Sequence, residues 1–335
     1  MLLKVGINGF GRIGRLVLRA LLEKNDKDIC VLAINDLGNL EQNIHLLKYD
    51  TVHGKLPFEA NFIDQIANID GKAINFYSKK LPEEIPWENH DIDIVLECTG
   101  IFTKADEAEK HIKGSVKKVL ISAPASNADI TVVFGVNNNL LKKEHKIISN
   151  ASCTTNCLAP IAQIINDNFE IEAGFMTTVH SFTSDQRILD GLHNDLRRAR
   201  TASSSMIPTS TGAAKAVGLV LPELHGKLDG TAIRIPTPNV SMIDFTFNTK
   251  KNISVESINL QIKESCFNKF KNIVEYNELP LVSIDFNHNP ASSIFDSTQT
   301  QTTGKKFGRI LSWYDNEWGF SNRMIDVCKS LGQLL

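Results

Sequence analysis

The 335-residue sequence lacks a charge imbalance, a long apolar run and a secretory leader. Lys and Arg number 36 and Asp and Glu number 38, which gives a formal net charge of −2. This balance offers no electrostatic footprint for DNA, RNA or an acidic membrane. No apolar run approaches the length that spans a bilayer, and the start "LLKVGINGFG" has no signal-peptide regions. We therefore expect a soluble, cytoplasmic protein that binds neither nucleic acid nor membrane.

Cysteine is also scarce, and its six positions form no framework: Cys30, Cys98, Cys153, Cys157, Cys266 and Cys328. Disulfide frameworks are typical of short secreted chains. Cys153 and Cys157 are four residues apart, but no second Cys or His pair at zinc spacing follows. We expect no metal site, and we expect most of these cysteines to be small buried hydrophobic residues.

The first half of the chain alternates strand and helix patterns. Residues 3–7, 29–35, 92–100 and 117–124 are short apolar runs, and residues 12–24 carry apolar side chains at helical spacing. Continuous apolar strands are typical of a parallel sheet that is buried on both faces. The alternation predicts an α/β fold with a doubly wound parallel sheet.

The second half has the period-2 pattern of an antiparallel sheet. Apolar residues alternate with polar ones in "VSMIDFTFN" (240–248) and "LVSIDFN" (281–287), and residues 254–264 place Val255, Ile258 and Ile262 on one helical stripe. The last 15 residues also form a helical pattern, with Met324, Cys328 and Leu331 on one face. We expect a dinucleotide-binding domain at 1–151, a catalytic domain at 152–316, and a helix at 317–335 that packs back onto the first domain.

The stretch "GFGRIG", Gly9 to Gly14, fits the G-x-G-x-x-G dinucleotide motif. Alone it would be a chance cluster of glycines, but a strand precedes it and an amphipathic helix follows. Gly9 would permit the tight turn, Gly11 would let the backbone approach a pyrophosphate, and Gly14 would let helix and strand pack closely. Asp36 ends the next strand, 22 residues after Gly14. We favour a ribose-binding role for Asp36 over an ordinary loop carboxylate.

The stretch "SNASCTTN" precedes a helical pattern, and Ser152 is a plausible N-cap for it. A thiol at Cys153 would feel the helix dipole, which favours the thiolate. Cys157 lies one turn further along and is more plausibly structural, and Pro160 predicts a kink. His180 follows 27 residues after Cys153 and could act as its base. A thiol can add to an aldehyde, lose hydride to a nicotinamide and become a thioester.

Six motifs together give the chain a resemblance to a known family: "NGFGRIGR", "SNASCTTNCLAP", "LRRAR", "PTSTGAAKAV", "RIPTPNVS" and "WYDNEWGFSNR". They resemble phosphorylating glyceraldehyde-3-phosphate dehydrogenase nearly from end to end. The resemblance implies a Rossmann NAD domain, an α+β catalytic domain and a glycolytic or gluconeogenic oxidoreductase. It implies Cys153 as the nucleophile, His180 as the base, and an oxyanion held by backbone N–H groups near Cys153 and by the His180 side chain.

The same resemblance implies the binding residues. For NAD they are Gly9, Gly11, Arg12, Ile13, Asp36, Lys80, Thr99, Ser122 and Asn316. For the phosphate of the substrate they are Thr183 and Arg234, and for inorganic phosphate they are Ser152, Thr154, Arg198, Thr211 and Gly212. Hydroxyls, backbone donors and guanidinium groups are what phosphate recognition needs. The polar segment 181–205 resembles a loop that packs between subunits, so the resemblance also implies a homotetramer.

Three positions depart from the commonest family pattern. Phe320 replaces a Tyr after "NEWG", Ser184 replaces an Asn, and Leu192 stands where NAD-specific members often carry Pro. The last change weakens one support for NAD over NADP, but Asp36 remains. Other functions stay open from the residues: an erythrose-4-phosphate dehydrogenase that hydrolyses its thioester, a Cys–His hydrolase, or a non-enzymatic NAD-binding protein.

Overall fold

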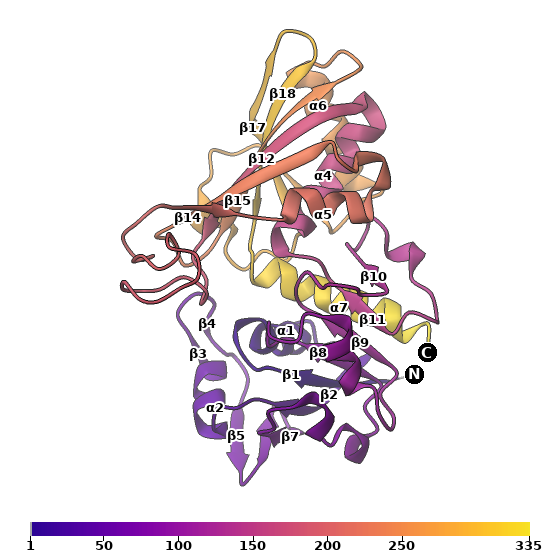
Figure 1. The fold of residues 1–335 in the computed structure, drawn as a ribbon, viewed down its shortest axis with the longest axis vertical. Helices are drawn as coiled ribbons and strands as arrows, with labels where there is room; N and C mark the ends of the chain where they lie inside the picture. The colour runs from indigo at the N-terminus through magenta and orange to yellow at the C-terminus, as the bar shows by residue number, and fades with distance from the viewer. Residues whose placement is uncertain (1) are drawn as a thin grey trace. The chain divides into compact units, whose positions relative to one another are not determined.

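The computed structural model describes residues 2–335, which divide into two compact units. The first unit comprises the described residues up to Val132, together with Asn138–Ser152 and Ser321–Leu335. The second unit comprises Val133–Asn137 and Cys153–Phe320. Figure 1 colours the chain from the N-terminus to the C-terminus.

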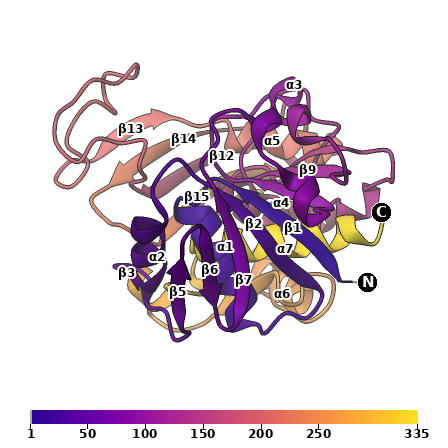
Figure 2. The same cartoon turned by 90° about the horizontal axis from the view of Figure 1, so that it is seen from below.

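The first unit is built on a nine-stranded sheet in the order β10-β11-β9-β8-β1-β2-β7-β6-β5. Its strands are β1 (Leu3–Asn8), β2 (Ile29–Asn35), β5 (Ala60–Ile63), β6 (Ile66–Ile69), β7 (Lys72–Tyr77), β8 (Ile94–Glu97), β9 (Lys118–Ile121), β10 (Ile130–Thr131) and β11 (Ile147–Ser149). Strands from β10 to β7 pair in parallel, and β6 and β5 extend one edge in antiparallel fashion. Figure 2 shows β1, β2, β7, β6 and β5 in this order. The predicted parallel α/β sheet is confirmed.

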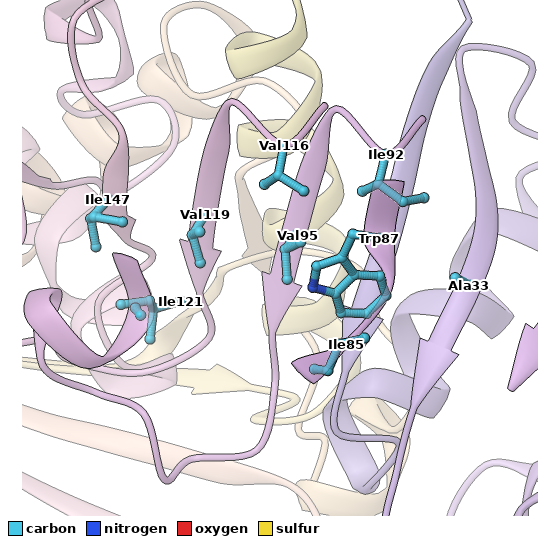
Figure 3. Close-up of a cluster of buried hydrophobic side chains, with 10 residues drawn as sticks. Ala33, Ile85, Trp87, Ile92, Val95, Val116, Val119, Ile121 and Ile147 are labelled. Carbon is cyan, nitrogen blue, oxygen red and sulfur yellow. The ribbon is translucent and has the colours of Figure 1, made fainter. Parts of the chain in front are cut away.

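The remaining elements of the first unit surround this sheet. They are α1 (Arg12–Glu23), α2 (Leu40–Lys48), β3 (Tyr49–Asp50), β4 (Gly54–Lys55), η1 (Pro82–Glu84), η2 (Trp87–His90), α3 (Ala105–Ala108), η3 (Glu109–His111), η4 (Asn138–Leu140) and most of α7 (Trp318–Gly332). Every residue of β8 and β9 is buried, as expected for strands covered on both faces. On one face Trp87 fills a cluster with Val95, Val119 and Ile121 (Figure 3).

The C-terminal helix α7 packs in the first unit through the face that its sequence pattern predicts. Met324, Cys328 and Leu331 are fully buried. Lys329 Nζ lies 2.6 Å from Asp26 Oδ2 and 3.1 Å from Asp28 Oδ2, so the last helix is tied to the segment that leads into β2. None of the helices among residues 2–335 has the length and apolar character that crossing a bilayer requires.

The second unit is built on a seven-stranded sheet in the order β13-β14-β12-β15-β18-β17-β16. Its elements are α4 (Cys153–Phe169), β12 (Ile171–Ser181), β13 (Ile207–Ser210), α5 (Ala213–Val220), η5 (Pro222–Leu224), β14 (Leu228–Ile235), β15 (Ser241–Thr249), α6 (Val255–Phe267), β16 (Val274–Asn277), η6 (Ser283–Phe286), β17 (Ser293–Thr303) and β18 (Phe307–Tyr314). Only the β12–β14 and β16–β17 pairs are parallel. The predicted largely antiparallel sheet is confirmed, and α4, α5 and α6 lie along one side of it (Figure 1).

One of the two predicted alternating strands of this sheet is correct and the other is wrong. In β15, Ile243, Phe245 and Phe247 are buried, as the alternation predicts. Residues 281–287 instead contain the short helix η6, and Ile284 is 67% exposed. The Val282 N–H donates to Asp285 Oδ2 at 2.8 Å, and this local side-chain cap replaces strand pairing.

Candidate active site

The glycine-rich turn joins β1 to α1, and its three glycines have different structural roles. Gly9 has a φ of +88°, and a Cβ there would lie 2.7 Å from the Thr99 backbone nitrogen. A Cβ on Gly14 would lie 2.1 Å from the Gly9 carbonyl oxygen, so the helix can approach the turn only without a side chain. A Cβ on Gly11 would meet no atom within 4 Å. The turn is therefore closed at Gly9 and Gly14 and open at Gly11.

Helix α1 begins at this open position without a side-chain cap. Gly11 occupies the N-cap and gives no capping hydrogen bond, and Arg12 and Ile13 form the first turn. The Arg12 side chain pairs with Asp50. Burial acts to raise the pKa of Asp50, but hydrogen bonds from Arg12 and from the His53 N–H lower it to about 2. Asp50 thus holds the Arg12 guanidinium. Arg12 contributes to the start of helix α1 through its backbone.

Asp36 follows β2 directly and is fixed beside the turn. Its Oδ2 accepts a hydrogen bond of 2.8 Å from the Phe10 N–H, and its Oδ1 accepts one of 2.8 Å from the Gly38 N–H. Asn43 Nδ2 donates to Oδ1 at 3.3 Å. Two carboxylate oxygens offer about four acceptor positions, so these three bonds leave acceptor capacity for a further donor. The adjacent Leu37 is 61% exposed and brings no cation.

A buried carboxylate, which sequence reasoning missed, organises the ends of β1 and β8. Glu97 Oε2 accepts hydrogen bonds from Asn8 Nδ2 at 2.6 Å and from His111 Nε2 at 3.0 Å. Trp87 Nε1 donates to His111 Nδ1 at 3.1 Å, which places the ring proton on Nε2, facing Glu97. Glu97 Oε1 accepts from the Thr99 N–H at 2.8 Å and from the Thr99 hydroxyl. Four donors therefore surround one carboxylate.

Two further residues predicted for the cofactor lie in the loops that follow strands of the same sheet. Ser122 follows β9, and its N–H donates to the Glu97 carbonyl at 2.9 Å. Lys80 lies exposed after β7, next to Lys79, whose N–H donates to Asn35 Oδ1 at 2.8 Å. Thr99, Ser122 and Lys80 therefore follow the carboxyl ends of parallel strands, where ligands of open α/β sheets bind.

The predicted nucleophile and base are brought together in the second unit. Cys153 is the first residue of α4, directly after Ser152, and His180 lies near the end of β12. Cys153 Sγ is 3.5 Å from His180 Nε2. His180 is almost fully buried, and Cys153 as a whole residue is partly exposed. Helix α4 and strand β12 run through the segment between the two residues and bring its ends together.

Opposing influences act on the pKa of the Cys153 thiol, and the predicted preference for the thiolate stays a prediction. Burial raises the pKa of the Cys153 thiol, although the positive charge of Arg234 acts in the opposite direction. Burial, together with Arg234, lowers the pKa of His180 to about 3. Desolvation therefore acts against charge on each group taken by itself. Charge can form here by proton transfer from the thiol to the ring.

The two residues predicted for the phosphate of the substrate lie close to this pair in sequence or in space. Arg234 lies opposite His180 in the β12–β14 register. Its Nη1 is 2.7 Å from His180 Nδ1 and 2.9 Å from the Ser181 carbonyl oxygen. Thr183 follows β12, and its N–H donates to Gln186 Oε1 at 2.9 Å. Arg234 is therefore in contact with the base and not only near it.

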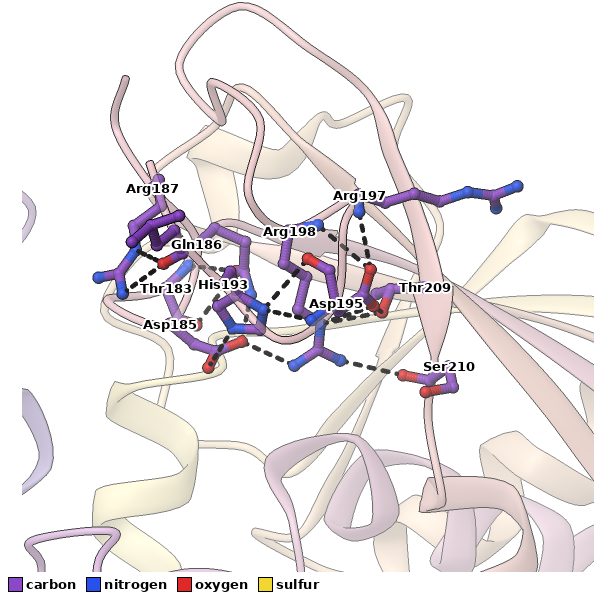
Figure 4. Close-up of polar contacts among 11 residues, drawn as sticks. Thr183, Asp185, Gln186, Arg187, His193, Asp195, Arg197, Arg198, Thr209 and Ser210 are labelled. Carbon is purple, nitrogen blue, oxygen red and sulfur yellow. Dashed lines mark hydrogen bonds and ion pairs between the residues drawn. The ribbon is translucent and has the colours of Figure 1, made fainter. Parts of the chain in front are cut away.

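Arg198 is held by a polar network in the loop between β12 and β13 (Figure 4). Its Nη1 lies 2.6 Å from Asp185 Oδ2, its Nε donates to Thr209 Oγ1 at 2.9 Å, and its Nη2 donates to the Ser210 carbonyl at 3.3 Å. Thr211 and Gly212 follow β13 at once, and Gly212 is the N-cap of α5 without a side-chain cap. The Ala213 N–H donates to Thr211 Oγ1 at 3.2 Å. A helix start of this kind is suited to an anion through its backbone N–H groups.

A second missed group lies beneath Cys153. Tyr314 is fully buried, and its hydroxyl is 2.8 Å from both Thr154 Oγ1 and Thr178 Oγ1. Thr178 donates in turn to the Met242 carbonyl at 3.1 Å, so the chain of donors runs from Thr154 through Tyr314 to Thr178. The Tyr314 ring packs edge-on against the His180 ring at 5.9 Å. The "WYDNEWG" motif contains Tyr314, but nothing in the sequence pattern indicates these partners.

Asn316 also belongs to the second unit and is almost fully buried. Its Oδ1 accepts a hydrogen bond of 2.7 Å from Ser241 Oγ, which itself accepts one of 3.1 Å from the Ser181 N–H. The side-chain amide is therefore fixed in orientation, with its oxygen occupied by Ser241.

Comparison with known families adds to this geometry. The model for the NAD-binding domain of glyceraldehyde 3-phosphate dehydrogenase matches residues 3–105, and the model for the C-terminal domain of the same enzyme matches residues 152–316. The chain belongs to the glyceraldehyde-3-phosphate dehydrogenase family. Both models together cover most of the chain, so the resemblance stated from the motifs is confirmed.

Individual members of the glyceraldehyde-3-phosphate dehydrogenase family match over the full length. The enzyme of Xanthobacter flavus is 55% identical over 334 residues, which covers all of both chains. The enzyme of Cereibacter sphaeroides is 51% identical over 335 residues, again all of both chains. Glyceraldehyde-3-phosphate dehydrogenase 1 of Bacillus cereus is 52% identical over 325 residues, or 97% of each chain.

The residues of the first unit fit NAD, the cofactor of this family. A pyrophosphate needs a close backbone approach, and Gly11 opens on space that a Cβ would occupy. It also needs donors, and α1 begins there without a capping side chain. Ribose hydroxyls need an acceptor, and Asp36 is fixed beside the same turn.

Proposed function

We propose that the protein is an NAD-dependent, phosphorylating dehydrogenase that converts D-glyceraldehyde 3-phosphate to 1,3-bisphosphoglycerate. The observation that carries this proposal is the Cys153–His180 pair, 3.5 Å apart in a chain of this family. The Cys153 thiol adds to the aldehyde carbon while its proton passes through His180 to the aldehyde oxygen, which gives a thiohemiacetal on the enzyme. His180 takes the hydroxyl proton of this thiohemiacetal as the hydride leaves. NAD, when bound, accepts the hydride. A thioester on Cys153 results, and inorganic phosphate attacks it to release the acyl phosphate and the thiolate.

The roles of the remaining residues are part of the same proposal. Gly9, Gly11, Arg12, Ile13, Asp36, Lys80, Thr99, Ser122 and Asn316 bind the cofactor; Thr183 and Arg234 bind the phosphate of the substrate; and Ser152, Thr154, Arg198, Thr211 and Gly212 bind inorganic phosphate. Arg234 and Arg198 support this division, because each presents a guanidinium from a different segment of the second unit. Residues 1–151 serve as the dinucleotide-binding domain and residues 152–316 as the catalytic domain.

The proposal also includes the oligomeric state and the cellular location of the protein. We infer a homotetramer, supported by the resemblance of residues 181–205 to the family's intersubunit loop and by exposed apolar side chains there, such as Leu189 and Leu192. We also infer that the enzyme works in the cytoplasm, as the sequence predicts for an NAD-dependent enzyme of central metabolism.

The test is the absorbance at 340 nm of the purified protein with glyceraldehyde 3-phosphate and NAD, with and without inorganic phosphate. We expect sustained turnover only when phosphate or arsenate is present, because the thioester needs an attacking anion. Full turnover without either anion would support the hydrolytic erythrose-4-phosphate dehydrogenase type. Failure to bind NAD would contradict every dehydrogenase reading.

A further inference from the structure

The backbone around Asn316, a residue proposed to bind the cofactor, is held by the preceding carboxylate. Asn316 lies between β18 and α7 and directly follows Asp315, which is almost fully buried. Asp315 Oδ1 accepts hydrogen bonds from the Glu317 N–H at 3.0 Å and from the Trp318 N–H at 2.7 Å. Asp315 Oδ2 accepts one of 2.8 Å from the His288 N–H. The turn that carries Asn316 is therefore fixed to the first residue of α7 and to the loop at His288.

The side chain of Asn316 is oriented by Ser241, the first residue of β15. Ser241 Oγ donates to Asn316 Oδ1 at 2.7 Å and accepts from the Ser181 N–H at 3.1 Å. Ser241 is fully buried, and among residues 2–335 its hydroxyl hydrogen has no acceptor other than Asn316 Oδ1. If the amide turned over, the hydroxyl would face an NH₂ group, and its hydrogen would be buried without an acceptor, which is costly. Ser241 therefore sets the orientation of the amide.

This orientation leaves the amide nitrogen of Asn316 as the group that a ligand can reach. Within the described residues 2–335, Asn316 Nδ2 donates to no partner, and it is not among the polar atoms that are buried without one. An amide NH₂ group donates and does not accept. A ligand that binds here must therefore offer an acceptor. Of the two polar atoms of a carboxamide, only the carbonyl oxygen meets this requirement.

We propose that Ser241 is a positioning residue that presents Asn316 Nδ2 to the carbonyl oxygen of the nicotinamide carboxamide. The site then selects dinucleotides whose ring substituent carries an acceptor oxygen, whether or not that substituent also has an NH₂ group. Ser241 Oγ also accepts from the N–H of Ser181, which directly follows His180 on β12. One hydroxyl thus links the strand of the proposed base to the residue that orients the nicotinamide. This inference rests on the proposed function, because the cofactor role of Asn316 is part of that proposal.

The test compares two analogues of NAD by titration calorimetry of the full-length protein, so that no turnover is needed. The 3-acetylpyridine analogue keeps the carbonyl oxygen and lacks the amide NH₂ group. The thionicotinamide analogue keeps the NH₂ group and has sulfur, a weaker acceptor, in place of the oxygen. We expect the unmodified protein to bind the acetylpyridine analogue about tenfold more tightly, a difference of about 1.4 kcal/mol. Equal binding of the two analogues, or tighter binding of the thionicotinamide analogue, would overturn the proposal.

Variants of Ser241 separate orientation of the amide from a merely structural role. In Ser241→Ala the amide of Asn316 can turn over and accept from the NH₂ group of the thionicotinamide analogue, so the difference between the analogues should largely disappear. Ser241→Thr keeps the hydroxyl and should restore the difference. Ser293→Ala is the matched control, because it removes an equally buried hydroxyl from β17 that bonds to Ser312 and not to Asn316. This control should keep the difference, and its loss there would contradict a specific role of Ser241.

Asn316→Ala distinguishes failure of this proposal from failure of the proposed function. If Asn316→Ala keeps the difference between the analogues, Asn316 does not hold the nicotinamide, and both the cofactor role of Asn316 and the role of Ser241 are wrong. If the difference is lost in Asn316→Ala and persists at full size in Ser241→Ala, only the role of Ser241 is refuted. Turnover of the unmodified protein with and without phosphate tests the phosphorylating activity independently of both variants.

Discussion

Two cysteines four residues apart on one helix have opposite chemical characters. Cys153 begins α4 and faces His180, while Cys157 is fully buried with its Sγ 3.3 Å from Ser293 Oγ. Burial raises the pKa of Cys157 to about 12, and the Ser293 hydroxyl opposes this only in part. A thiol of this kind behaves as a small apolar side chain with a weak donor. Position along the helix, and not the residue type, therefore separates the proposed nucleophile from the buried core cysteine.

This contrast gives a paired prediction. Cys153→Ser should abolish formation of the acyl-enzyme, because a hydroxyl lacks the acidity and nucleophilicity of the thiol. Cys157→Ser should retain most of the activity and lose about 1 kcal/mol of stability, the usual scale for a small change at a buried site. Iodoacetamide labelling with peptide mapping checks the assignment. Inactivation that follows labelling at Cys157 or Cys266 would contradict it.

The sequence predicts only part of this site. Cys153 and His180 could be predicted because each lies in a distinctive stretch that ends or begins a regular element. The buried partners Tyr314 and Glu97 could not, because their roles depend on residues that are distant along the chain. Tyr314 meets Thr154 across 160 residues, and Glu97 meets Asn8 across 89.

At the scale of elements, hydrophobic periodicity correctly predicted β15, which pairs with a strand on each side. It failed for residues 281–287, where a side-chain cap replaces strand pairing. β15 lies between β12 and β18, so its alternation is satisfied on both edges. The segment 281–287 has a similar alternation, but Asp285 caps the Val282 N–H and the chain turns into η6. Phe286 of this segment is buried, and its ring stacks on the Trp313 ring with 5.4 Å between centroids.

The turn between β1 and α1 allows a second paired prediction. Gly14→Ala should destabilise the fold by about 1–3 kcal/mol or more, because the new Cβ would collide with the Gly9 carbonyl. Gly11→Ala meets open space, so it should cost about 1 kcal/mol or less through the weaker N-cap. The same methyl group should nevertheless weaken NAD binding sharply, since it fills the approach to α1. Urea unfolding and NAD titration of both variants separate stability from binding. Tight NAD binding by Gly11→Ala would show that the pyrophosphate lies elsewhere.

At the scale of the whole molecule, the chain crosses between its two units more often than the sequence suggests. Residues 133–137 belong to the second unit and 138–152 to the first, so the chain passes between the two units more than once before Cys153. Residues 133–137 pack closely in the second unit at Gly135, where a Cβ would lie 2.3 Å from Ile273 Cδ1. Such packing is set by a residue more than 130 positions away, which no local pattern can show. The fold class could be predicted because continuous apolar strands and alternating strands differ in their local sequence.

Cofactor choice can be measured through the stability of the intact protein. Asp36 is held beside the turn by Phe10, Gly38 and Asn43, and a 2′-phosphate there would meet a carboxylate with no cation from Leu37 or Gly38. Such a like-charge contact costs several kcal/mol. We therefore expect NAD to bind at least about a hundredfold more tightly than NADP, since each 1.4 kcal/mol is about tenfold in affinity.

The corresponding heat-unfolding experiment uses both cofactors at one concentration, a hundred times the Kd of NAD. Saturation by NAD should add about 2.7 kcal/mol of stability, and NADP at that concentration about 0.4 kcal/mol. For a chain of this length these values correspond to a rise in Tm of roughly 4 °C with NAD and under about 1 °C with NADP. In Asp36→Gly the rises in Tm with NAD and with NADP should become similar. The substitution removes both the acceptor for the ribose hydroxyls and the repulsion of the 2′-phosphate. Equal rises in the unmodified protein would mean that Asp36 does not face the ribose, and that Leu192 marks a real loss of NAD specificity.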